Sequence, residues 1–128
     1  MNVKIEHVAF WVSDLEAMKV FYIKYFSGKA SSLYKSKSKD FQSYFIAFES
    51  GARIELMKMP EFEKTNEKKG RGYSHVAFSI GSKEKVDELT TRMEKDGIMV
   101  QSQPRYTGDG YYESVIIDIE DNIVEITE

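Results

Sequence analysis

The chain has 128 residues, 41% of them hydrophobic and 30% charged, which is the composition of an ordinary folded protein with one domain. Its net charge of -3 argues against nucleic acid as the main partner, because phosphate contacts need a clustered excess of lysine and arginine. The sequence contains no cysteine, which excludes disulfides and thiolate metal ligands, so any bound metal must use nitrogen and oxygen.

The sequence has no apolar run of about 18 residues, the length that a membrane-spanning helix requires. Its N-terminus also lacks the basic and then apolar pattern of a secretory signal. We therefore expect a cytoplasmic protein that does not interact with membranes.

The first predicted helix covers about residues 14–26, with Ser13 as N-cap, Glu16 completing a capping box and Gly28 ending the helix. Its apolar residues recur at helical spacing and predict a face that packs on a sheet: Leu15, Met18, Phe21, Tyr22 and Tyr25. A second helix is predicted from just after Ser82 to Gly97. Its inward residues are expected to be Val86, Leu89 and Met93.

Segments typical of β-strands surround both predicted helices. Besides the strands at the two histidines, the expected strands cover about residues 29–35, 43–49, 52–58, 98–103, 111–119 and 123–127. Residues 104–110 are rich in turn formers and predict a loop. Each half of the chain thus has the order strand, helix and three strands, which predicts an α+β fold of two tandem βαβββ modules. Module 1 is expected at about 1–59 and module 2 at about 72–128, joined by a charged linker at about 60–71.

An internal repeat is the most informative feature of the sequence. His7-Val8-Ala9-Phe10 recurs as His75-Val76-Ala77-Phe78, 68 positions later. Each copy closes on a glutamate between apolar residues, Glu55 in Ile54-Glu55-Leu56 and Glu125 in Val124-Glu125-Ile126, and these glutamates lie 70 positions apart. The chain has only two histidines, and both fall at repeat-equivalent positions.

The repeat predicts a metal site. Alternate residues of a strand face opposite sides of the sheet. In the strand of His75, Val76 and Phe78 therefore lie on an apolar side, while His75 and Ala77 lie on the other side, which is small and polar. A buried carboxylate without a partner costs several kcal/mol, so two glutamates at matched positions suggest a shared counter-charge. A divalent cation bound by His7, Glu55, His75 and Glu125 would supply it. Two imidazoles and two carboxylates suit nickel, zinc, cobalt, manganese or iron(II).

A simpler interpretation is also open. Both histidines would then be hydrogen-bonded core residues, and the duplication would have preserved the glutamates as packing relics.

The chain resembles the vicinal oxygen chelate superfamily, which includes glyoxalase I, methylmalonyl-CoA epimerase, extradiol dioxygenases, fosfomycin-resistance enzymes and bleomycin-binding proteins. The resemblance covers essentially the whole chain and is carried by the segments 5–10, 53–56, 73–78 and 118–126. It implies that the mixed sheet curls into a cup around the metal, with the helices on the outside. It also implies a homodimer.

Within this superfamily, the four residues His7, Glu55, His75 and Glu125 resemble the His, Glu, His, Glu ligand set of glyoxalase-I-like members. Glu55 is the residue that distinguishes this set from the others. Epimerases commonly carry glutamine there, dioxygenases and fosfomycin enzymes use three ligands, and bleomycin binders lack the ligands. Trp11 stands where bacterial glyoxalase I often has an arginine that helps to hold glutathione, which argues against a glutathione substrate. The turn at 118–122 also departs from the usual family sequence.

The resulting hypothesis is a lyase or isomerase, similar to lactoylglutathione lyase, that acts on a small oxygen-chelating substrate. A bound metal would stabilise an enediolate intermediate, and nickel or zinc is the metal that we expect. Glu125 is predicted to be the proton shuttle, with Glu55 as the alternative base.

Two further functions stay open on the same residues. A binding protein of the bleomycin-resistance type would line the cup with Trp11, Tyr106 and Tyr112, although each of these aromatic residues can also serve in packing. An iron(II) extradiol dioxygenase is the other alternative. For any of the three, Arg105 and Arg71 are candidates for contact with an anionic substrate, although loop arginines also serve as solvated surface.

Overall fold

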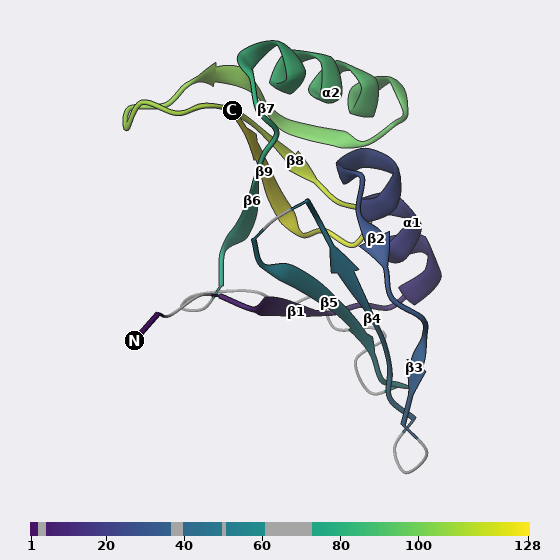
Figure 1. Cartoon of the computed structure of the whole chain (residues 1–128). Coiled ribbons are helices and arrows are strands. Elements are labelled where there is room, and N and C mark those ends of the chain that lie inside the picture. Colours follow the sequence, from purple (N-terminus) through teal and green to yellow (C-terminus); the bar gives the residue numbers. More distant parts are fainter. Residues whose placement is uncertain (3–4, 37–39, 50, 61–72) are drawn as a thin grey trace. The chain divides into compact units, whose positions relative to one another are not determined.

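The computed structural model describes residues 1–2, 5–36, 40–49, 51–60 and 73–128. The chain divides into two compact units, Met1–Glu67 and Lys68–Glu128, which we call module 1 and module 2. In the described part of the chain, each unit contains one helix and one mixed sheet, so the α+β class is confirmed (Figure 1). The predicted linker at 60–71 lies outside the described residues except for Pro60. Neither described helix has the length and apolar character needed to cross a membrane.

Module 1 follows the predicted order of elements. They are β1 (His7–Trp11), α1 (Leu15–Phe26), β2 (Lys29–Ala30), β3 (Tyr34–Lys35), β4 (Gln42–Ala47) and β5 (Arg53–Lys58). The sheet runs β1-β5-β4-β2, with β3 also paired to β4, and only the β1 and β5 pair is parallel. Buried residues of α1, among them Met18 and Tyr22, are accompanied in the core by Ile46 and Leu56 from the sheet.

The strand predicted at 29–35 is split in two. Ala30 pairs with Ile46 whereas Tyr34 pairs with Ser43, so four steps along the first segment match three steps along β4. One residue is therefore accommodated as an irregularity between β2 and β3.

The N-cap of α1 is Asp14, so the prediction of Ser13 with a capping box is wrong. Asp14 has an extended backbone, and its Oδ1 accepts a hydrogen bond from the Ala17 backbone N–H at 3.0 Å. Glu16 instead accepts a hydrogen bond of 2.5 Å from the hydroxyl of Tyr44. At the other end, Ser27 takes the left-handed conformation with φ of 55°.

Module 2 repeats the plan. Its elements are β6 (His75–Ser79), α2 (Lys83–Lys95), β7 (Met99–Tyr106), β8 (Tyr112–Ile117) and β9 (Ile123–Thr127). The sheet order is β6-β9-β8-β7, with β6 and β9 parallel. The strand β7 continues to Tyr106, so the loop predicted from residue 104 starts too early. Pro104 is tolerated because β7 is an edge strand and its register against β8 shifts between Ser102 and Arg105.

The buried face of α2 contains one polar residue, Thr90. Val86, Thr90 and Met93 are buried, while Leu89, predicted to point inward, is only half-buried. Thr90 Oγ1 donates a hydrogen bond of 2.7 Å to the Val86 carbonyl and lies 2.7 Å from Ser114 Oγ in β8. These two bonds satisfy a hydroxyl that would otherwise destabilise the core.

Gly28 provides a test of how closely α1 packs on its sheet. A Cβ at this position would overlap Cγ2 of the fully buried Ile46 and lie 3.2 Å from the Tyr22 carbonyl oxygen. We expect Gly28→Ala to lower the free energy of unfolding by about 1–3 kcal/mol, measured by urea denaturation. Gly108→Ala is the control, because a Cβ there meets nothing within 4 Å. Equal stability of the two variants would contradict this packing.

Candidate metal centre

Each histidine lies beside a glutamate on a neighbouring parallel strand. In module 1, His7 is opposite Arg53 and Ala9 is opposite Glu55. In module 2, His75 is opposite Ile123 and Ala77 is opposite Glu125. Since residues two apart on a strand face the same side, the same register makes each histidine a diagonal neighbour of its glutamate. We call His7 and Glu55 the first pair, and His75 and Glu125 the second pair.

Both pairs lie on the sheet face opposite the helix of their own module. In module 1, Phe10, next to Ala9, has its ring 6.3 Å from Tyr22 of α1. In module 2, Ser114 pairs with Ile126 of β9 and contacts α2, so Glu125 points to the other side. In β6 the predicted separation is confirmed: Val76 and Phe78 are half-buried, whereas His75 and Ala77 are exposed.

The first pair is held by charged neighbours. Nε2 of His7 lies 3.7 Å from Oε1 of Glu55, while Nδ1 lies 2.9 Å from Oε1 of Glu6. Arg53 donates two hydrogen bonds to the Glu6 carboxylate, from Nη2 at 2.7 Å and from Nε at 3.2 Å. The guanidinium of Arg53 also lies 4.1 Å over the ring of Phe45. The hydrogen bond from Arg53, supported by His7, lowers the pKa of Glu6 to about 2.

The second pair has a different environment. Nε2 of His75 lies 3.2 Å from Oε1 of Glu125, and Nδ1 lies 3.1 Å from the hydroxyl of Ser74. A second carboxylate, Glu113, is on the same face because it pairs with Thr127, two residues beyond Glu125. Burial raises the pKa of Glu113, and the charge of Glu125 adds to this effect.

Two residues beside the pairs, Glu6 and Glu113, were not predicted from the sequence as part of the site. Glu6 directly precedes His7, and Glu113 is a carboxylate inside a strand that is otherwise buried and mostly apolar. For Glu113, an acid in such a strand was the available signal, the same one that identified Glu55 and Glu125.

The donor set fits a divalent cation of the borderline type. Each pair presents an imidazole nitrogen and a carboxylate oxygen within 4 Å, while the other ring nitrogen contacts an adjacent side chain. This is the usual arrangement of a histidine that binds a metal through Nε2. Among the described residues, histidines and acids form no group of three or more that could hold an ion by itself. The structure therefore brings His7 to Glu55 within module 1 and His75 to Glu125 within module 2.

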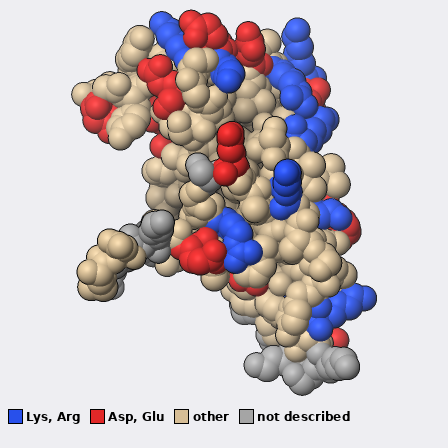
Figure 2. Space-filling view, in the orientation of Figure 1, with Lys and Arg blue, Asp and Glu red and all other residues tan. Residues whose placement is uncertain are grey.

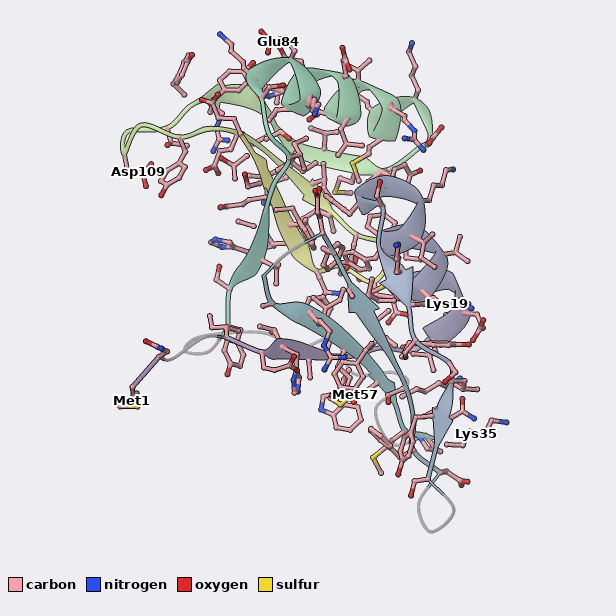
Figure 3. All side chains as sticks on the ribbon, viewed as in Figure 1. Met1, Lys19, Lys35, Met57, Glu84 and Asp109 are labelled. Atoms are coloured by element: carbon pink, nitrogen blue, oxygen red, sulfur yellow. The ribbon has the colours of Figure 1, made fainter. Side chains whose placement is uncertain are left out.

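Trp11 shares its face with the first pair and belongs to an aromatic patch. Trp11 pairs with Met57, Met57 with Ser43 and Ser43 with Tyr34, which places them in one row across the sheet, next to the row of Glu55. Phe41 contacts both the indole and the Tyr34 ring, with centroids 6.3 and 6.0 Å apart. Met57, labelled in Figure 3, lies directly opposite Trp11 in this row. We call Trp11, Tyr34 and Phe41 the aromatic patch.

Tyr106 and Tyr112 lie on the other face of their sheet. The hydroxyl of Tyr112 donates a hydrogen bond of 2.5 Å to Asp87 of α2, and Lys83 lies over both tyrosine rings. This hydrogen bond raises the pKa of Tyr112 to about 12, with burial as the second cause. The helix side is opposite to the second pair, so the structure does not bring these tyrosines to the candidate site.

Arg105 lies in β7 and pairs with Glu113, on the same face as the second pair. Its Nη1 donates a hydrogen bond of 2.8 Å to the Glu113 carbonyl and lies 3.8 Å from the Glu113 carboxylate. Arg71 is outside the described residues.

In the view of Figure 2, acidic and basic side chains are mixed over α2.

The sequence matches one family model, described as the Glyoxalase/Bleomycin resistance protein/Dioxygenase superfamily, over residues 6–114. A search of curated protein sequences found no match.

Solved structures show the same fold at low sequence identity. A glyoxylase/bleomycin resistance protein/dioxygenase domain from Frankia sp. EAN1pec has a TM-score of 0.84 and 17% identity, covering 99% of this chain and 98% of that one. Glyoxalase I from Zea mays has a TM-score of 0.81 and 18% identity over 97% of this chain, which spans only 44% of the maize protein. The fosfomycin resistance protein FosX from Listeria monocytogenes has a TM-score of 0.76 and 21% identity, covering 99% and 94%.

The position of Tyr112 leads to a pH-dependent prediction. Its pKa is raised in the folded state, so the hydrogen bond to Asp87 stabilises the fold below about pH 10, the ordinary tyrosine pKa, and this contribution is lost as the pH rises toward about 12. We expect Tyr112→Phe to lower the free energy of unfolding at pH 8, with the difference from wild type shrinking above pH 10. Urea denaturation at several pH values measures this. Weaker metal binding in Tyr112→Phe, with unchanged stability, would instead connect Tyr112 with the candidate site.

Proposed function

Because the chain belongs to the glyoxalase/bleomycin resistance/dioxygenase superfamily, we propose that it is a metal-dependent enzyme whose first and second pairs together bind one divalent cation. The supporting observation is the shared register of the two modules, which sets an imidazole Nε2 within 4 Å of a carboxylate in both. Packing relics of a duplication would have no need to keep this donor geometry twice.

The charges of the two pairs agree with a bound cation. The side chains of Glu55 and Glu125 are only 15% and 23% exposed, so both carboxylates are partly removed from water. A cation offsets the cost of that desolvation for both of them. Two nitrogen and two oxygen ligands suit nickel or zinc, and cobalt, manganese and iron(II) are compatible.

For the reaction, we propose proton transfer at a carbon next to a carbonyl, in the manner of a glyoxalase-I-like lyase or isomerase. A bound divalent ion supplies Lewis acidity toward the oxygens of a small chelating substrate. Glu125 is the proposed general base, with Glu55 as the fixed ligand. Two observations support this assignment: Glu125 is the more exposed carboxylate, and Glu55 lies two residues from the cation of Arg53 on the same face.

Arg105 is the proposed contact for an anionic group of the substrate, since it lies on the face of the second pair and its side chain is 42% exposed. The superfamily also supports a homodimer as the proposed assembly.

Replacement of the proposed base separates proton transfer from ion binding. We expect Glu125→Gln to lower kcat at least about 100-fold, because the amide cannot accept the proton, while most of the bound metal is retained. The assay is turnover of the substrate found in a panel of hemithioacetals and 2-oxo acids, with metal content measured by elemental analysis. Glu84→Gln, an exposed change on α2 labelled in Figure 3, is the control. Full activity of Glu125→Gln would refute the assignment.

The aromatic patch supports a second candidate, a small-molecule binding protein of the same superfamily. Trp11 is 44% exposed and Tyr34 is 56% exposed, and contiguous exposed apolar patches are a common feature of binding surfaces. The patch adjoins the row of Glu55, so a ligand on it would reach the first pair.

The single tryptophan makes this candidate testable. A planar aromatic ligand that stacks on the patch should change the fluorescence of Trp11 in metal-free protein. Tyr34→Ala should then weaken binding about 3-fold to 10-fold, as expected for the loss of one ring contact. Tyr111→Ala, which removes a 55% exposed tyrosine of module 2, is the matched control. Binding without turnover would favour this candidate over the enzyme, whereas oxygen consumption with catechols and iron(II) would favour a dioxygenase.

A further inference from the structure

The two histidines differ in the group that contacts Nδ1. In module 1 this group is the carboxylate of Glu6, and in module 2 it is the hydroxyl of Ser74. The residue across the strand pair also differs, since Arg53 lies opposite His7 and Ile123 lies opposite His75. The four residues from each histidine onward are otherwise identical, so the modules diverge in the groups that orient the ring.

The contacts of His7 determine which ring nitrogen carries the proton. A carboxylate only accepts hydrogen bonds, so the 2.9 Å contact with Glu6 requires a proton on Nδ1. Arg53 holds that carboxylate by two hydrogen bonds and is itself packed on Phe45. Nε2 then has a free lone pair, and its 3.7 Å distance to Glu55 is too long for a hydrogen bond that would protonate it.

The contacts of His75 favour the opposite tautomer. A hydroxyl can donate or accept, so Ser74 does not require a proton on Nδ1. Nε2 lies 3.2 Å from the carboxylate of Glu125, which attracts a proton on that nitrogen. Without a bound cation, the geometry therefore favours an Nε2 proton on His75, with the hydroxyl of Ser74 donating to Nδ1.

We propose that Glu6 and Arg53 are positioning residues that hold His7 in the Nδ1–H tautomer, so that module 1 is the preformed half of the metal centre. His75 has to move its proton from Nε2 to Nδ1 before that nitrogen can bind an ion. The part of the proposal that concerns an ion rests on the proposed function, whereas the tautomer of His7 follows from contacts inside module 1. A carboxylate on the remote nitrogen also fixes the orientation of a ligating imidazole ring, which strengthens binding at His7.

The tautomers can be measured directly in metal-free protein. Two-bond proton and nitrogen-15 correlation spectra distinguish Nδ1–H from Nε2–H, and a chain with two histidines gives two ring spin systems. The His75→Gln variant assigns them. At a pH where both rings are neutral, we expect Nδ1–H for His7 and Nε2–H for His75.

Variants of Glu6 test whether this carboxylate is the cause. In Glu6→Ala we expect His7 to become a mixture of tautomers. Glu6→Gln should largely keep Nδ1–H through its amide oxygen, and Glu49→Ala, an exposed acid of the same module, should change nothing. An Nε2–H tautomer of His7 in the wild type, or an unchanged His7 in Glu6→Ala, overturns the proposal.

Metal affinity supplies the second readout. In titrations with Zn²⁺ or Co²⁺ alone, Glu6→Ala should weaken binding about 10-fold to 100-fold. Ser74→Ala should weaken it less, because Ser74 does not fix the tautomer. Equal affinity of Glu6→Ala and Glu49→Ala, in a wild type that binds metal, contradicts the proposal. A wild type that binds neither ion contradicts the proposed function instead, and the tautomer spectra still decide the role of Glu6.

Circular dichroism and thermal unfolding show whether each variant folds. If Glu6→Ala does not fold, Arg53→Met provides the second test, since it leaves Glu6 in place and removes the two hydrogen bonds that hold it. A mixed tautomer of His7 in Arg53→Met supports the proposal, and a pure Nδ1–H tautomer contradicts the role of Arg53.

Discussion

The candidate site depends on the register of two parallel strand pairs. When β1 pairs with β5 so that Ala9 lies opposite Glu55, the residue two positions earlier, His7, must face the same side of the sheet. The same relation between β6 and β9 holds for His75 and Glu125. A shift of one residue in either pair would turn one partner toward the helix and separate the imidazole from the carboxylate.

The small residues of the repeat leave space for this arrangement. Ala9 and Ala77 lie directly opposite the glutamates, so no bulky side chain stands between the acid and the diagonal histidine. The intervening residues of each strand, such as Phe10 and Phe78, are less exposed, in keeping with a face turned toward the helix. One short sequence thus serves two purposes, since its apolar residues anchor the strand and its histidine is left accessible.

The modules share a backbone plan but differ in the charges around it. Module 1 sets a cation and an anion, Arg53 and Glu6, beside its histidine, and module 2 sets the buried carboxylate of Glu113 beside its glutamate. These surroundings agree with the roles proposed above, in which the first pair holds an ion and the more exposed Glu125 exchanges a proton.

The N-cap of α1 and the start of the loop at residue 104 were predicted wrongly from the sequence. Ser13 and Asp14 are both good N-caps, and only the backbone conformation shows that Asp14 is used. Pro104 predicts a break, but an edge strand tolerates it. Tyr106 and Tyr112 are residue types that often line ligand sites. The strand register nevertheless places them on the helix side of the sheet, where Tyr106 contacts Lys83 and Tyr112 contacts Asp87.

The sequence alone determined the α+β class, the duplication, the family resemblance and the four matched residues, because periodicity and an internal repeat are visible without coordinates. Tertiary structure decided which partners each of those residues has. Glu6 and Arg53 are 47 residues apart in the chain and meet only because β1 and β5 are neighbours. No local sequence pattern therefore predicts that they lie beside His7. Long-range pairing of strands therefore determines how the candidate ligands are oriented, whereas local sequence determines which residues are available for that role.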